Sequence, residues 1–171
     1  EVTQLSDIVD GYIIAARLED QALVIDPGFV DLRVLAREVI DRLPTPAEVT
    51  LDDSGDDFTC WADPLRVRQI LRTVLANVVA SGGRDLHVRP ERSETEIVVT
   101  IEASGSDLDP DVSLTATESG HPSTLSSGTR TRPVAMGLGV PARLAELMGG
   151  TLRCRRESGR IRLDVSFPVG A

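Results

Sequence analysis

Two stretches of the chain decide the expected fold, namely CWADPLRVRQILRTVLANVV at residues 60–79 and GLGVPARLAELMGG at residues 137–150. In the first stretch Asp63 precedes Pro64, and apolar residues then recur every three or four positions. This pattern predicts a long amphipathic helix that Asp63 caps and that the glycine pair 82–83 ends. In the second stretch a turn containing two glycines precedes a shorter helix.

Outward from these helices, the periodicity predicts a further helix and a set of strands. Asp31 can cap a helix over residues 32–43, LRVLAREVIDRL, which ends before Pro44. Strands are expected near residues 49–51, 58–61, 86–90, 96–103, 151–157 and 160–168. We expect the first two strands to form a hairpin around an acidic loop. Segregated helices and antiparallel strands predict an α+β fold, a two-layer α/β sandwich with a mostly antiparallel sheet.

The beginning of the sequence is expected to form a separate helical element. Apolar residues from Val2 to Leu18 alternate steps of three and four, which predicts an amphipathic helix over residues 2–22. Its repeat of about 3.5 residues favours packing against another helix, although a core helix of one globule is the alternative. We expect residues 1–23 to be this element and residues 24–171 to be one domain. Because Glu1 is not a start Met, we expect a piece of a longer protein.

Composition restricts the classes of function. The formal net charge is -9, which disfavours a nucleic-acid partner, and the absence of Lys excludes a lysine nucleophile. No apolar run approaches the roughly 20 residues of a membrane-spanning helix, so we expect a cytoplasmic chain without membrane contact of its own, with the cytoplasmic part of a larger or membrane-bound sensor as the alternative. Cys60 and Cys154 match no metal spacing and are expected to be reduced thiols. With only five aromatic residues, the core is expected to consist of Val, Leu, Ile and Ala.

A polar stretch of unusual length separates the two deciding segments. Residues 106–132 are rich in Ser, Thr, Gly and Asp, too long for a plain connector, and we expect a lid at about residues 106–133 or a disordered insert. Beyond it, Gly137 and Gly139 precede a helix. Glycines there let backbone N–H groups approach an anion, or simply allow close packing, and the residues alone leave both interpretations open.

Taken together, this order of pieces resembles the ATP-binding domain of sensor histidine kinases, which shares its Bergerat-type fold with gyrase, the Hsp90 chaperones and the MutL proteins. The resemblance covers residues 24–168, and its most specific pieces are the two stretches quoted above. It implies a GHKL-type (HATPase) domain of a two-component signalling protein. Residues 1–23 look like the second helix of a dimerisation hairpin, which implies a homodimer formed through them.

The resemblance also assigns site residues, beginning with the asparagine box. Asn77 sits where the family's Asn holds the Mg²⁺ that bridges the ATP phosphates, a role suited to a neutral oxygen ligand on a helix. Thr73 replaces the first Asn of that box, and Ala80 stands where a Lys or Arg often follows. An exposed polar residue on the helix is the alternative interpretation of Asn77.

The first glycine box departs further from the family. Its pattern D-x-G-x-G aligns with residues 103–107, so Ala103 replaces the aspartate that accepts the adenine amino hydrogen, Gly105 is kept, and Asp107 replaces the second glycine. A methyl group accepts no hydrogen bond, and the loss of such a buried partner costs about 1–3 kcal/mol, or roughly 5- to 150-fold in affinity. Asp107 adds negative charge near the expected phosphates. Both changes oppose ATP.

The second glycine box and the phosphoacceptor are incomplete as well. The pattern G-x-G-L aligns with Ala135, Met136, Gly137 and Leu138, followed by Gly139, so one glycine is lost. No F-box phenylalanine lies between residues 107 and 132. Neither His87, in an expected strand, nor His121, before a proline, has the helical context of a phosphoacceptor, so we expect none in this chain.

Three functions follow from the resemblance. The departures favour a degenerate domain, a pseudokinase with weak or no ATP binding, no catalytic residue and a docking or regulatory role in a phosphorelay. The alternative is an active ATP:protein-histidine phosphotransferase that uses ATP and Mg²⁺ and phosphorylates a histidine outside this chain. A stand-alone regulator of the anti-sigma type is the third, which the helix at residues 2–22 disfavours. Implied partners are a response regulator or a histidine-bearing partner helix.

Overall fold

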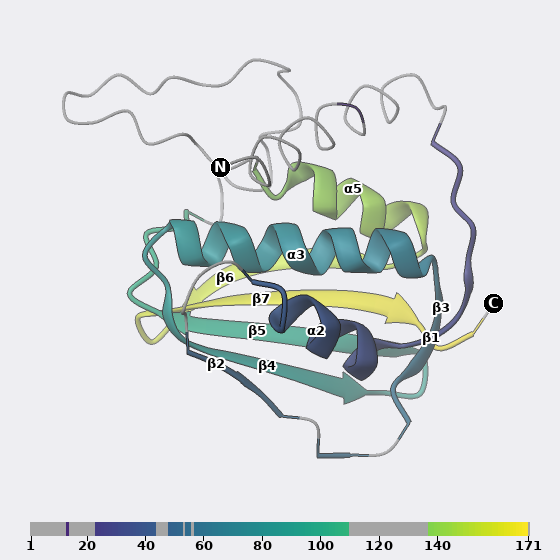
Figure 1. The fold of residues 1–171 in the computed structure, drawn as a ribbon, viewed down its shortest axis with the longest axis horizontal. Helices are drawn as coiled ribbons and strands as arrows, with labels where there is room; N and C mark the ends of the chain where they lie inside the picture. The colour runs from purple at the N-terminus through teal and green to yellow at the C-terminus, as the bar shows by residue number, and fades with distance from the viewer. Residues whose placement is uncertain are drawn as a thin grey trace.

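The computed structural model describes residues 13, 23–43, 48–52, 54–55, 57–109 and 137–170 (Figure 1). The helix expected over residues 2–22, except for position 13, and most of the polar stretch 106–133 lie outside these residues. The predicted division at residue 23 therefore stays a prediction.

The expected two-layer α+β architecture is confirmed (Figure 1). Three helices, α2 (Leu32–Ile40), α3 (Pro64–Ala80) and α5 (Gly139–Leu147), lie on one face of a five-stranded sheet. The strand order is β2 (Val49–Leu51), β4 (Arg84–Arg92), β5 (Glu96–Ser104), β7 (Arg160–Pro168) and β6 (Thr151–Glu157). All neighbouring strands of this sheet are antiparallel except β2 and β4, which are parallel.

A single apolar core lies between the helices and the sheet. Alternate residues of β5 and β7, such as Ile101 and Leu163, have no exposed surface, and they meet the apolar face of α3, including Val74. Among the described residues, Phe58 and Phe167 supply the only buried aromatic rings. The core therefore consists mainly of Val, Leu, Ile and Ala, as the composition predicts.

The predicted hairpin between residues 49–51 and 58–61 is wrong. Strand β2 pairs with β4, Val49 opposite Leu86, whereas β3 (Thr59–Ala62) pairs with β1 (Gly28–Asp31) in a separate two-stranded sheet. Strand β1 was not expected, because it begins at the glycine of a Pro-Gly turn and its four residues carry little periodicity. Its pairing places the ring of Phe29 edge-on to that of Trp61, with 4.8 Å between centroids.

Aspartate caps fix where two helices begin, as predicted. The Asp31 carboxylate accepts the backbone N–H groups of Arg33 and Val34 at the start of α2. Helix α2 ends at Ile40 rather than at residue 43, because the chain tightens there into i→i−3 hydrogen bonds, among them Leu43 N to Ile40 O at 3.1 Å.

The cap of α3 also binds the incoming chain. Oδ1 of Asp63 accepts the N–H groups of Leu65 and Arg66 at 2.8 and 3.2 Å, and Oδ2 accepts the N–H of Asp26 at 3.0 Å. With 5% of its surface exposed, Asp63 joins the segment before β1 to the beginning of α3. The position of α3, which carries the asparagine box, depends on this carboxylate.

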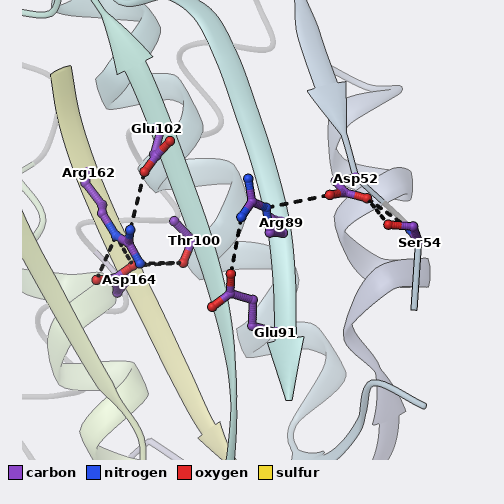
Figure 2. Close-up of polar contacts among 8 residues, drawn as sticks. All are labelled: Asp52, Ser54, Arg89, Glu91, Thr100, Glu102, Arg162 and Asp164. Carbon is purple, nitrogen blue, oxygen red and sulfur yellow. Dashed lines mark hydrogen bonds and ion pairs between the residues drawn. The ribbon is translucent and has the colours of Figure 1, made fainter. Parts of the chain in front are cut away.

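The other face of the sheet carries a network of ion pairs (Figure 2). Asp164 accepts hydrogen bonds from the Thr100 hydroxyl at 2.9 Å and from Nε of Arg162 at 3.0 Å, and it pairs with Arg155 at 3.2 Å. Burial lowers the pKa of Arg162, but the hydrogen bond that Arg162 donates to Asp164 and the charges of Asp164 and Glu102 outweigh it, so this pKa is raised. The network joins β5, β6 and β7 on the face that the three helices leave uncovered.

Candidate functional site

Asn77 lies on the buried side of α3, in the last full turn before the helix ends. Its side chain is 5% exposed, and its amide nitrogen donates to the carbonyl oxygen of Thr73, one turn earlier, at 2.8 Å. This bond fixes the orientation of the amide, so the carbonyl oxygen is the atom suited to a cation. Thr73, which replaces the first Asn of the box, thus contacts Asn77 through its backbone.

Ala103 occupies a fully buried position near the end of β5. In the cross-strand register it lies opposite Ile161 of β7, which lies opposite Arg156 of β6. Residues directly opposite each other share a face, so this row faces the helices. Ala103 and Ile161 have 0% exposed surface. The position expected to bind the adenine amino group therefore presents a methyl group inside a closed apolar wall.

The segment after β5, residues 105–109, is attached to the end of α3. Gly105 adopts a left-handed conformation with φ of 69°, and an added Cβ there would lie 3.4 Å from Gly82 O. The hydroxyl groups of Ser106 and Ser81 are 2.6 Å apart, and the N–H of Asp107 donates to Ser81 O at 2.8 Å. Gly105 and Asp107 are therefore brought to the carboxyl end of α3, one turn beyond Asn77.

Arg156 of β6 attaches the same segment from the other side. Its Nη2 donates to the carbonyl oxygens of Ser106 and Leu108 at 2.9 and 2.8 Å. These residues, with Asp107 and Asp109, line an open depression of about 380 Å³. Two positions before Arg156 on the same strand, burial raises the pKa of the Cys154 thiol to about 11; the Arg156 charge opposes this shift and the Asp109 charge adds to it.

Helix α5 begins with the glycine stretch of the second box. Gly139 is buried, and Leu138, directly before it, has 0% exposed surface. The carbonyl oxygen of Leu138 accepts the N–H of Ala142 at 2.9 Å, and no side chain of the described residues caps the helix. Gly137 is half-buried, whereas Ala135 lies outside the described residues. The packing of Leu138 supports close contact as one reason for the flanking glycines.

These residues match an ATP and Mg²⁺ site only in part. Asn77 offers a suitable oxygen, and α5 packs along α3, so the two boxes lie on neighbouring helices. In contrast, Ala103 offers no acceptor and no surface, and Asp107 carries the wrong charge for a phosphate neighbour. In the described part of the chain, no three His, Cys, Asp or Glu side chains are grouped to hold a metal ion. The donor set therefore does not fit the nucleotide as the family binds it.

His87 takes no part in this arrangement. His87 is exposed on β4 and lies opposite Glu102, on the sheet face away from the helices. His121 lies outside the described residues. The prediction that neither is the phosphoacceptor stays a prediction, and no described helix carries a histidine.

Three residues that shape this region were not identified from the sequence, namely Ser81, Ser106 and Arg156. The only available signal was the placement of Arg156 in β6, where Leu152 and Cys154 alternate on the helix-facing side. An arginine that continues this alternation is a charged group on an apolar face. The sequence does not show which group it binds.

The comparisons place the chain in a family. A family model described as "Histidine kinase-, DNA gyrase B-, and HSP90-like ATPase" matches residues 62–170. No curated protein matches the sequence. Among the described residues, no helix has both the length and the hydrophobicity of a membrane span.

Solved structures of histidine kinases have the same fold. The Acinetobacter baumannii histidine kinase AdeS is 17% identical with a TM-score of 0.70, over 98% of this chain and 80% of that one. Full-length ShkA in complex with AMPPNP is 21% identical with a TM-score of 0.74, over 98% of this chain and 36% of that one. The histidine kinase ThkA, in complex with the response regulator TrrA, is 17% identical with a TM-score of 0.66, over 98% and 49%.

At these identities the likeness concerns the fold, whereas the family model matches well over half of the chain itself. The chain belongs to the family of histidine kinase-, DNA gyrase B- and HSP90-like ATPases, and its fold is that of histidine kinase catalytic domains.

Proposed function

We propose that this chain is a degenerate ATP-binding domain of a two-component signalling protein, which binds nucleotide weakly or not at all and acts as a docking or regulatory module. The observation that carries the proposal is the environment of Ala103. This residue has 0% exposed surface and lies beside Ile161 in the apolar row that faces the helices. A purine would find neither an acceptor nor space at this position.

Two independent penalties oppose ATP binding. A missing acceptor for a buried donor costs about 1–3 kcal/mol, or roughly 5- to 150-fold in affinity. Asp107 adds a second penalty, because a carboxylate close to the phosphates repels them. Together these penalties place ATP affinity well below that expected of a domain with the complete first glycine box.

A docking role would use the helices and the sheet of the family fold, which this chain retains. The α3 and α5 helices and the five-stranded sheet are all present. Because ThkA was solved in complex with the response regulator TrrA, a response regulator is one proposed partner, and a histidine-bearing helix is the other. We further propose that residues 1–23 end a dimerisation hairpin, that the protein is a homodimer through them, and that it acts in the cytoplasm.

Asn77 favours a second function, the active histidine kinase. Its amide nitrogen donates to the carbonyl oxygen of Thr73 at 2.8 Å, and an amide oxygen is a type of ligand that suits Mg²⁺. In that function the chain would transfer the γ-phosphoryl group of ATP to a histidine outside this chain. Catalysis would then depend mostly on positioning and on neutralising charge.

Restoring the first glycine box tests the proposal. We expect the double substitution Ala103→Asp with Asp107→Gly to raise ATP affinity at least 5-fold over the wild type, measured by competition with a fluorescent nucleotide in the presence of Mg²⁺. The matched control is Ala103→Val with Asp107→Gly, because valine has nearly the size of aspartate but no acceptor. A folded Asp-containing variant that binds no better than this control would contradict the role given to the acceptor.

A further inference from the structure

Arg156 is a charged side chain on the side of the sheet that faces the helices. Across the strands, Arg156 lies opposite Ile161, which in turn lies opposite Ala103, and Ile161 and Ala103 are both fully buried. Neighbouring strands lie about 5 Å apart, so two strand spacings put the Arg156 backbone about 10 Å from that of Ala103. An arginine side chain extended from this position can reach the segment that leaves β5.

Nη2 of Arg156 donates two hydrogen bonds to that segment. The acceptors are the carbonyl oxygens of Ser106 and Leu108, at 2.9 and 2.8 Å from Nη2. On the α3 side, the same segment is held by the Ser81–Ser106 hydroxyl pair at 2.6 Å and by the Asp107 N–H. The segment is therefore attached at both sides, to α3 by Ser81 and to β6 by Arg156.

We propose that Arg156 is a clamp that fastens residues 106–108 to the sheet and so holds the nucleotide-binding end of the domain closed. This inference rests on the proposed nucleotide site. Ala103 exposes no surface, so a purine that reaches it must displace part of its wall. The segment after β5 is held by these few hydrogen bonds rather than by the strand ladder, which makes it the part that can move.

The strength of the two Arg156 hydrogen bonds determines how much their loss changes the population of the open state. Hydrogen bonds from a charged donor are stronger than neutral ones, but Arg156 is an exposed side chain and solvent weakens them. We therefore expect loss of the two bonds to raise the population of the open state about 5- to 30-fold.

Amide hydrogen exchange tests the clamp without nucleotide. Arg156→Met keeps an unbranched stem and removes every donor, and we expect the amides of Asp107 and Leu108 to exchange about 5- to 30-fold faster in it. Arg153→Met is the matched control, because Arg153 is exposed on the same strand but on the opposite face. Exchange that is equally fast in both variants, or unchanged in Arg156→Met, would overturn the clamp.

Nucleotide titration tests what the clamp does. Arg156→Met is added to the chain that carries Ala103→Asp and Asp107→Gly, and ATP affinity is measured with Mg²⁺. Apparent affinity scales with the open fraction when the closed state predominates, so the gain in affinity should match the gain in exchange rate, about 5- to 30-fold. Equal or weaker ATP binding after this substitution would overturn closure as the role of Arg156.

These readouts separate the clamp from the proposed function. If the wild type binds ATP tightly, the degenerate function is wrong. The ATP affinities of Arg156→Met and Arg153→Met are then compared in the chain without the substitutions at Ala103 and Asp107. Arg156→Lys keeps one charged donor group and should lie between wild type and Arg156→Met in both exchange and affinity. It also replaces Arg156→Met if that variant does not fold. A lysine variant that behaves as the methionine variant in both measurements would also count against the clamp.

Discussion

Asp63 connects the incoming chain to the start of α3, and its removal should be among the costliest single changes at a polar residue. The substitution Asp63→Ala removes the acceptor for two helix N–H groups and for the N–H of Asp26. Loss of a cap costs about 1 kcal/mol. The lost bond from Asp26 to a charged acceptor, nearly buried, adds about 1–2 kcal/mol. We expect a total of about 2–3 kcal/mol.

The measurement is urea unfolding followed by the fluorescence of Trp61, the only tryptophan. With a urea m-value of roughly 1–3 kcal/mol/M, the midpoint should fall by roughly 1–3 M. Asp31→Ala is the matched control, because the Asp31 carboxylate caps α2 in the same way but, in the described structure, accepts no hydrogen bond from a distant backbone group. We expect this control to lose only about 1 kcal/mol. Equal losses in the two variants would refute the reasoning about Asp26.

Three further outcomes follow from the described contacts. Asp164→Ala should lower the free energy of unfolding by about 2 kcal/mol, because the buried Thr100 hydroxyl loses its charged acceptor; a loss below about 0.5 kcal/mol in chemical denaturation would contradict this. Burial raises the pKa of the Cys60 thiol from 9.0 to about 12, so the folded state keeps a proton that the unfolded chain releases. The free energy of unfolding should therefore fall as pH rises from 9 to about 12, more steeply in wild type than in Cys60→Ala, and equal slopes would count against the assignment. Gly150→Ala should prevent stable folding, because the new Cβ would lie 1.9 Å from the backbone oxygen of Ser166; a variant with a wild-type melting temperature would show that this approach is not so close.

Elements with strong local signals could be predicted from the sequence. Helix α3 begins at Pro64 after its Asp63 cap and ends before the glycine pair 82–83, as the pattern indicates. Strands β6 and β7 also match the expected ranges 151–157 and 160–168, because both segments alternate apolar and polar residues. In each case the information lies within one element or one turn.

Pairing between distant segments could not be predicted in this way. Extended residues on both sides of an acidic loop suggested a hairpin, yet Val49 lies opposite Leu86 and β2 joins β4 instead. The bonds from Arg156 span 50 and 48 residues to Ser106 and Leu108, and no local pattern encodes them. The candidate site was therefore predicted residue by residue from the family resemblance, whereas the contacts that close it required the structure.

The most direct test of the central claim is a calorimetric titration of the unmodified chain with ATP and Mg²⁺. The buried methyl group of Ala103 and the charge of Asp107 predict no binding heat, or a Kd of about 1 mM or weaker. A Kd below about 0.1 mM with one site per chain would contradict the degenerate function and support the active kinase.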